Sequence, residues 1–185
     1  MKPLTLDDLL PLEEFAGRRQ EFFESHRRYL DRYRRVRIGP RLTLLFENHL
    51  TVRYQIQEMV RTERMVKEAD IQHEIDTYNE LLGGEGELGC TLLIEIEDPA
   101  VRDEKLRAWW RLPEKIYLLL EDATRIWATF DDRQRGDDRV SSVQYLKFNT
   151  GGRVQVALGV DLPGLQAETK LTEEQRQALR EDLSS

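Results

Sequence analysis

Apolar residues in the first part of the chain recur at helical spacing. The aromatic and apolar side chains between positions 12 and 36 follow one another at steps of seven, four and three: Phe15, Phe22, Tyr29, Tyr33 and Val36. This spacing places them on one face of a helix, so a long helix is predicted over residues 12–36. The Gly39–Pro40 pair ends it, and a strand or hairpin is predicted near residues 36–47.

Two further helical segments are predicted before residue 82. Asn48 or Thr51 is expected to cap the first of them, although alternate apolar residues over 52–56 also fit a strand. The second covers Asp70–Leu82, and the glycine pair at 83–84 ends it. Residues 1–82 are therefore expected to be mainly helical.

The rest of the chain has the alternating pattern of antiparallel strands. Residues 90–160 are expected to be mainly β, interrupted by a helix that begins at Asp98–Pro99. Turn-forming residues at 122–123, 131–138 and 151–152 separate the later strands, which predicts hairpins. Thr172 and Gln175 form a capping box that opens a C-terminal helix over 172–183.

These elements predict one α+β domain over residues 1–185. N-terminal helices are followed by an antiparallel sheet of five or six strands and then by the C-terminal helix. A chain of 185 residues is long enough to bury a core without disulfides or a structural metal.

Composition narrows the class of protein. The one cysteine, Cys90, cannot form an intramolecular disulfide, a four-cysteine zinc site or a cysteine-ligated iron–sulfur cluster. The longest apolar run is Ile116–Leu120, far below the roughly 20 residues that cross a bilayer. Asp7 and Asp8 do not fit a signal peptide. We therefore expect a soluble cytoplasmic protein without membrane contact, and the sequence predicts no bound cofactor.

Charge is divided unevenly along a chain whose net charge is −7. Arg18–Arg41 holds nine arginines and three acids, whereas Glu74–Glu104 holds ten acids and one arginine. A basic segment is one signature of a nucleic-acid surface. It also fits ion pairing with the acidic stretch, or the solvated side of a helix. The aromatic residues of Arg18–Arg41 sit at core spacing, which favours the last two interpretations.

One short segment hints at a metal site. Asp70-x-x-His73 approximates the carboxylate–histidine spacing of a di-iron bundle, but such a centre needs a second pair of this kind. Thr77 stands where the zinc-protease motif requires its second histidine. A mononuclear site built from Asp70, His73 and Glu74 remains a possible alternative.

The segment 55–79 is the densest in polar side chains. Glu58 and Arg61 lie three residues apart, which is typical of an ordinary intrahelical ion pair. If the fold buries such residues instead, they become the matched charges of a polar pocket. The candidate residues for that pocket are Glu47, Gln57, Glu58, Arg61, Asp76 and Asn79.

The tandem Trp109–Trp110 lies on a predicted amphipathic helix. One ring can reach the core while the other is exposed, and an exposed tryptophan is typical of partner surfaces.

Short segments over nearly the whole chain resemble one bacterial family. They are Leu44–Asn48, Tyr54–Met59, Glu74–Leu81, Glu97–Pro99 and Val143–Tyr145, together with the opening Leu4–Leu10. In these segments the chain resembles the domain-of-unknown-function family numbered 3501. The resemblance implies no activity and no catalytic residue. It implies, through neighbouring genes alone, a link to rubrerythrin and to an iron–sulfur protein related to heterodisulfide reductase.

Three functional hypotheses follow. The leading one is a non-enzymatic partner or accessory factor of an oxidative-stress or iron-linked redox system, which binds rubrerythrin or an iron–sulfur protein and self-associates. The first alternative is a small-molecule- or metal-dependent enzyme that uses a polar pocket from residues 58–79. The second alternative is nucleic-acid binding through Arg18–Arg41.

Overall fold

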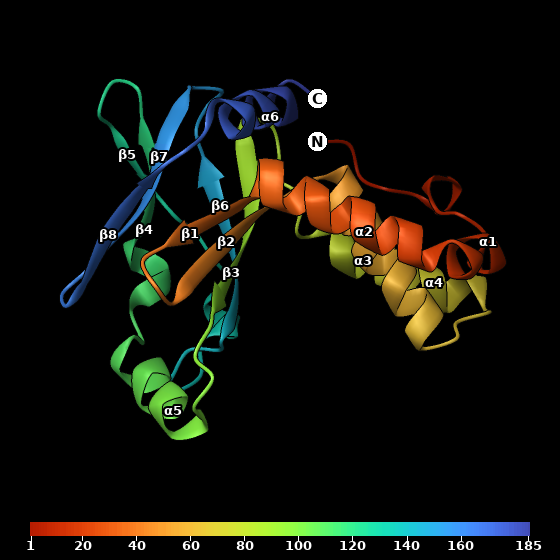
Figure 1. Ribbon diagram of the computed structural model, residues 1–185, viewed down its shortest axis with the longest axis horizontal. Helices are drawn as coiled ribbons and strands as arrows, with labels where there is room; N and C mark the ends of the chain where they lie inside the picture. The colour runs from red at the N-terminus through yellow and green to blue at the C-terminus, as the bar shows by residue number, and fades with distance from the viewer.

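A β-sandwich with a helical arm projecting from one side makes up the fold of the computed structural model, which describes residues 1–185 (Figure 1). The helices are α1 (Leu12–Gly17), α2 (Arg19–Tyr29), α3 (His49–Thr62), α4 (Glu68–Asn79), α5 (Pro99–Ala108) and α6 (Glu173–Leu183). The strands are β1 (Arg35–Ile38), β2 (Leu42–Glu47), β3 (Glu87–Ile94), β4 (Ile116–Leu120), β5 (Arg125–Trp127), β6 (Val143–Asn149), β7 (Gln155–Leu162) and β8 (Leu165–Lys170).

The strands form two antiparallel four-stranded sheets, ordered β1-β2-β3-β6 and β5-β4-β7-β8. Their inner faces share a core of 22 buried residues, including Leu44 and Phe148 of the first sheet and Leu118 and Leu158 of the second. Such face-to-face packing is the architecture of a β-sandwich. The two sheets also meet at one margin, where Thr129 pairs with Lys147 of β6.

The α+β class, the N-terminal helices and the C-terminal helix are confirmed, but the single sheet of five or six strands is wrong. The turns at 131–138 and 151–152 are crossings between sheets rather than hairpins, because β6 pairs with β3 and β7 pairs with β4. Strand β8, which pairs with β7, was not expected. The hairpin predicted near 36–47 is confirmed as β1 and β2.

Two helices close the ends of the sandwich, α6 at one end and α5 at the other (Figure 1). Leu179 of α6 and Leu106 of α5 both belong to the shared core. Each helix begins at a predicted cap: the Asp98 side chain accepts from Ala100 and Val101, and the Thr172 side chain accepts from Gln175.

The arm consists of α1–α4 and has a core of its own. Val52 and Ile56 of α3 pack with Ile75 of α4 and with Leu81 and Leu82, which follow α4. Asn48 is the residue that caps α3, and the alternation over 52–56 does not produce a strand. No helix in the structure combines the length and apolar character needed to cross a membrane.

The long helix predicted over 12–36 is interrupted twice. Arg18 leaves the helical region, with φ −110° and ψ 15°, and separates α1 from α2. After α2, Leu30–Arg34 forms a π-helical turn, and β1 begins at Arg35. Val36 therefore belongs to the core of the sandwich, because the pairing of β1 with β2 overrides its helical spacing.

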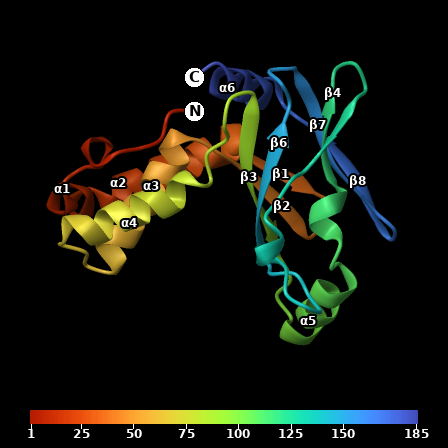
Figure 2. The ribbon, with the colours of Figure 1, turned by 180° about the vertical axis from the view of Figure 1, so that it is seen from behind.

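A tight glycine turn sets the end of the arm against the first sheet. A Cβ at Gly89 would lie 1.9 Å from the carbonyl oxygen of Leu81, and one at Gly83 would lie 2.1 Å from that of Glu87. Only glycine permits this approach of two backbones. The turn joins the C-terminal end of α4 to β3, and the view from behind shows this end of the arm meeting the first sheet (Figure 2).

Candidate functional site

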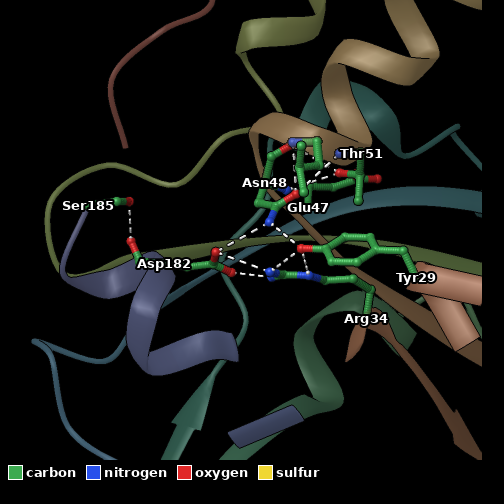
Figure 3. A network of polar contacts seen from close by, with 8 residues as sticks. Tyr29, Arg34, Glu47, Asn48, Thr51, Asp182 and Ser185 are labelled. Atoms are coloured by element: carbon green, nitrogen blue, oxygen red, sulfur yellow. Dashed lines mark hydrogen bonds and ion pairs between the residues drawn. The ribbon is translucent and has the colours of Figure 1, made fainter. Parts of the chain in front are cut away.

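The arm, the sandwich and α6 meet at a buried polar junction (Figure 3). Arg34 pairs there with Asp182, and both side chains are buried. The guanidinium also donates to the Tyr29 hydroxyl, at 2.9 Å from Nε. The Asn48 amide donates to the same hydroxyl at 2.8 Å and to Asp182 at 3.4 Å. Burial raises the pKa of Asp182, and Arg34 opposes that rise.

Glu47 extends this junction into the space between the first sheet and α3. Its carboxylate accepts from Thr91 of β3 at 2.6 Å, from Gln55 at 3.0 Å and from Thr51. Burial raises the pKa of Glu47, against three hydrogen bonds that act to lower it. Only 3% of the residue is exposed. Glu47 is therefore enclosed by the fold and out of reach of a bound molecule.

A groove of about 1060 Å³ lies beside this junction, between α4 and β6. We call it the α4–β6 groove. Its walls are formed by residues of α4 and the turn after it, of β3, of the 129–134 loop and of β6: Glu74, Thr77, Tyr78, Glu80, Leu81, Cys90, Thr129, Phe130, Asp131, Arg133, Gln134, Tyr145, Leu146 and Lys147. The groove is thus built jointly by the arm and the sandwich.

Two tyrosines line the α4–β6 groove from opposite elements. Tyr78 projects from α4, and partial burial together with the nearby Glu74 raises its pKa. Tyr145 projects from β6 and remains 45% exposed. Val143, two residues earlier on the same face of β6, is also exposed. The groove therefore adjoins an apolar strip on the outer face of the first sheet.

The charged side chains of the groove are only partly paired. Arg133 pairs with Asp131, and Lys147 lies 4.0 Å from Glu87 and donates to the carbonyl of Leu82 at 3.1 Å. Glu74 and Glu80 make no ion pair in the structure, although Glu80 is near enough to raise the pKa of Arg133. Helix α4 contains no lysine or arginine, and Glu74 is the one of its four acids that lines the groove. Glu74 and Glu80 together make this wall acidic.

The open edge of β6 is closed by a side chain. The Gln134 amide donates to the carbonyl oxygen of Tyr145 at 3.1 Å and accepts from its N–H at 2.7 Å. Two residues further along β6, Thr129 and Lys147 exchange two backbone hydrogen bonds of 2.8 Å each. The edge therefore has no free main-chain groups for an added strand at these two residues.

The structure does not bring the residues of the predicted polar pocket together. Asn79 and Gln57 instead hold the N-terminal segment on the arm. The Asn79 amide exchanges hydrogen bonds of 2.8 and 2.9 Å with the backbone of Leu4. The Gln57 amide does the same with Leu10, at 2.7 and 3.2 Å. The oxygen and the nitrogen of both side-chain amides therefore already have hydrogen-bond partners.

The charged members of that set also lie apart. Glu58 is paired with Arg19 of α2 at 2.9 Å and with Arg61 at 3.2 Å. Asp76 is exposed and accepts from Gln72 at 2.8 Å. These are surface interactions that hold the helices of the arm together. The structure therefore contains no polar pocket of the kind that the enzyme hypothesis based on residues 58–79 requires.

The metal set is not assembled either. Asp70 and His73 are exposed on α4, and Glu74 points into the α4–β6 groove. The structure contains no group of three histidine, cysteine, aspartate or glutamate side chains close enough to bind one ion. The helical spacing that suggested the set spreads its side chains over the helix surface.

The tandem tryptophans divide as expected. Trp109 packs against the core of the sandwich, whereas Trp110 is exposed. The Trp110 indole nitrogen donates to the carbonyl of Gly136 at 3.0 Å, and Arg135 lies 4.1 Å from its ring centre. Trp110 therefore fixes the 130–139 loop, and its role as a partner surface stays a prediction.

The basic segment is largely neutralised, but not by the stretch Glu74–Glu104. Five of its nine arginines form ion pairs, all with acids outside that stretch: Arg18, Arg19, Arg32, Arg34 and Arg35. The interpretation that the two stretches pair with each other is therefore wrong. The fold therefore also reduces the charge available for nucleic acid.

The sequence did not predict that the residues of the α4–β6 groove come together. Tyr78 and Tyr145 lie in segments that carry the family resemblance, yet nothing in their spacing shows that they meet. The available signal was the alternation of Val143 and Tyr145, which put two large apolar side chains on the solvent face of a strand.

The comparisons agree with this architecture. The model of a family described as "Protein of unknown function (DUF3501)" matches residues 3–183. The crystal structure of a novel protein of unknown function from Burkholderia pseudomallei K96243 is similar, with a TM-score of 0.90 and 30% sequence identity over 98% of this chain and 100% of that one. A search of the curated proteins gave no match. The chain belongs to the DUF3501 family.

Proposed function

We propose that the protein is a non-catalytic binding protein that holds a basic segment of a partner protein in the α4–β6 groove. The observation that carries this proposal is the groove itself, an open cavity of about 1060 Å³ with aromatic side chains and one acidic wall. Its volume is at the upper end of the ~300–1,000 Å³ of small-molecule sites. An extended segment of a protein suits such a space better than a small substrate does.

The chemistry of the walls indicates what the segment contains. Glu74 and Glu80 offer carboxylates without cation partners, so lysine or arginine side chains are favoured opposite them. Tyr78 and Tyr145 offer large, partly exposed rings, which are typical anchors of protein interfaces. The preferred segment therefore carries both basic and apolar residues.

The same geometry argues against catalysis at this place. Glu47, whose pKa is raised by burial, is the carboxyl group best suited to acid–base chemistry, but it is enclosed behind the groove. A general base must come within hydrogen-bond reach of its substrate. The residues predicted for an enzyme pocket serve other contacts in the arm.

The family resemblance supplies the first partners to test, rubrerythrin and the iron–sulfur protein. Neither the family description nor the relative from Burkholderia names a partner. An accessory role in an iron-linked or oxidative-stress system is therefore part of the proposal. A second copy of the chain is the third occupant to test, since self-association is also proposed.

Photo-crosslinking tests the location of the binding surface. A benzoylphenylalanine placed at Tyr145 samples the groove, and one placed at Trp127 samples an equally exposed aromatic position, 42% against 45%, in the other sheet. With purified rubrerythrin or the iron–sulfur protein, we expect a crosslink from position 145 and none from position 127. Equal crosslinking at both positions, or none at position 145 with either partner and with the chain itself, would overturn the proposal.

A further inference from the structure

A second cavity, independent of the α4–β6 groove, lies inside the arm. It has a volume of about 320 Å³ and runs between α2 and α3. Five of its ten lining residues carry rings: Phe15, Phe22, His26, Tyr29 and Tyr54. We call it the arm cleft. Its volume is at the lower end of the range of small-molecule sites.

The rings of the arm cleft form a continuous packed wall. Phe15 stacks on Phe22 with 5.4 Å between ring centres, and Tyr54 meets Phe15 edge-on at 6.0 Å. His26 stacks on Tyr54 at 3.9 Å, with 13° between the ring planes. Flat apolar molecules bind well against such surfaces because ring–ring contact adds to the apolar area they bury.

The imidazole nitrogens of His26 have no partner in the fold. The ring stacks on Tyr54 and lines the cleft, but it makes no hydrogen bond or ion pair within the chain. Burial, with a contribution from Arg35, lowers the pKa of His26 to about 4. Near pH 7 the ring is therefore neutral and offers one donor and one acceptor to a molecule in the cleft.

Arg53 gives the cleft its charge preference. This exposed residue of α3 lines the arm cleft and makes no ion pair or hydrogen bond through its guanidinium. Asp8 lines the neighbouring 220 Å³ pocket, which Arg53 also borders, but the two residues are not paired. The other polar groups are occupied, since Gln57 holds Leu10 and the Ser25 hydroxyl donates to the carbonyl of Glu21 at 2.8 Å.

From these features we propose that the arm cleft is a binding site for a small aromatic anion. The aromatic part lies against the rings of Phe22 and Tyr54, the anionic group faces Arg53, and a polar atom of the ligand bonds to His26. The site uses none of the residues that line the α4–β6 groove. Failure of either proposal therefore leaves the other intact.

Two fluorescent probes that differ by one charged group test this site. Anilinonaphthalene sulfonate carries a sulfonate, and N-phenyl-1-naphthylamine has the same rings without it. We expect both to bind the full chain saturably at one equivalent. The Arg53→Gln variant should weaken the sulfonate probe about fivefold and change the neutral probe by less than twofold. Arg53→Lys should largely restore the sulfonate probe, and Arg28→Gln, whose residue lines neither cavity, should have no effect.

The location is read from the imidazole signals. The chain has three histidines, so the NMR signals of His26 can be assigned with a His26→Gln variant. Binding in the cleft shifts His26 and leaves His73, on the opposite helix α4, unchanged. Ser25→Trp, which places a large side chain in the cleft from an exposed helical position, should abolish both probes while the melting temperature stays within a few degrees.

Several results would overturn the proposal. They are the absence of saturable binding, binding that leaves the His26 signals unmoved, and equal affinity of the sulfonate probe for the wild-type chain and for Arg53→Gln.

Discussion

Arg34, at the end of the turn that follows α2, forms a buried ion pair with Asp182 of α6, 148 residues further along the chain. The pair joins the helical arm to the helix that closes the sandwich, and Tyr29 and Asn48 surround it with further hydrogen bonds (Figure 3). A buried pair of this kind contributes little net stability compared with apolar residues of the same size, but the loss of one partner leaves an isolated buried charge. Because the pair links the two parts of the molecule, we expect it to help fix the angle at which the arm leaves the sandwich.

Replacement of Arg34 by Met tests the pair. We expect Arg34→Met to lower the free energy of unfolding by about 3–5 kcal/mol, because the Asp182 carboxylate stays buried without its cation. The double variant Arg34→Met with Asp182→Leu should recover more than half of that loss. Urea unfolding monitored by circular dichroism measures both. A loss below about 1 kcal/mol in the single variant would show that the pair is solvated.

Glu47 predicts a pH effect of definite sign. Because burial raises its pKa, the stability that this group contributes is fully present below pH 4.5 and is lost as the pH rises through its folded pKa. Glu47→Gln removes the charge, so its stability relative to the wild type should rise as the pH increases from 4 to 8.

The control for Glu47 is Glu58, which should show the opposite trend. Partial burial acts to raise the Glu58 pKa, but hydrogen bonds from Arg19 and Arg61 outweigh it and lower the pKa. The wild type should thus gain stability relative to Glu58→Gln as the pH rises through the lowered folded pKa towards 4.5, and the difference should stay constant above that. Unfolding curves at pH 3, 4, 6 and 8 distinguish the two. A flat difference for Glu47→Gln contradicts the assignment of a buried ionisable group.

The lowered pKa of His26 predicts a second pH range in which folding stability changes. Its pKa is lowered from 6.5 to about 4, so the unfolded chain takes up a proton in this range that the folded chain does not. Folding stability should fall as the pH drops from 6.5 to 4, by about 1–2 kcal/mol once partial exposure is allowed for. His26→Gln should remove this slope and the exposed His73→Gln should keep it. Melting temperatures over that range decide between them.

The two amide clamps predict local rather than global effects. Asn79→Ala and Gln57→Ala each free one backbone N–H and one C=O of the N-terminal segment, at a cost of about 1–3 kcal/mol. Amide hydrogen exchange should rise in residues 1–10 and stay unchanged in the sandwich. Asp76→Ala, on the exposed side of α4, should change neither. Faster exchange throughout the protein would contradict the clamp assignment.

Local signals in the sequence were sufficient to predict where several helices begin. The cap at Asp98 and the capping box of Thr172 with Gln175 depend on residues within three positions of one another, so they could be recognised without the fold. The division of the strands into two sheets depends on long-range pairing: β6 pairs with β3, and β7 pairs with β4. Pairing over such distances leaves no local pattern.

The candidate site was predicted only as far as local sequence allowed, because its side chains contact residues that are distant in the chain. Glu47 and Asn79 were predicted as members of a polar pocket, but their partners Thr91 and Leu4 lie 44 and 75 residues away. Arg34 was counted only as one arginine of a basic segment, because its partner Asp182 belongs to the last helix. The sequence therefore singled out polar residues that make tertiary contacts, without showing what they contact.

The binding function of the α4–β6 groove is tested most directly by calorimetric titration of purified rubrerythrin, and then of the iron–sulfur protein, into three forms of the chain. These are the wild type, a variant with Glu74→Lys and Glu80→Lys in the groove, and a control with Glu63→Lys and Glu68→Lys, which makes the same charge change at exposed positions outside it. We predict that one partner binds the wild type and the control alike, more weakly at higher salt, and binds the groove variant at least tenfold more weakly. Equal affinity for all three forms, or no binding of either protein to the wild type, would contradict the proposed function.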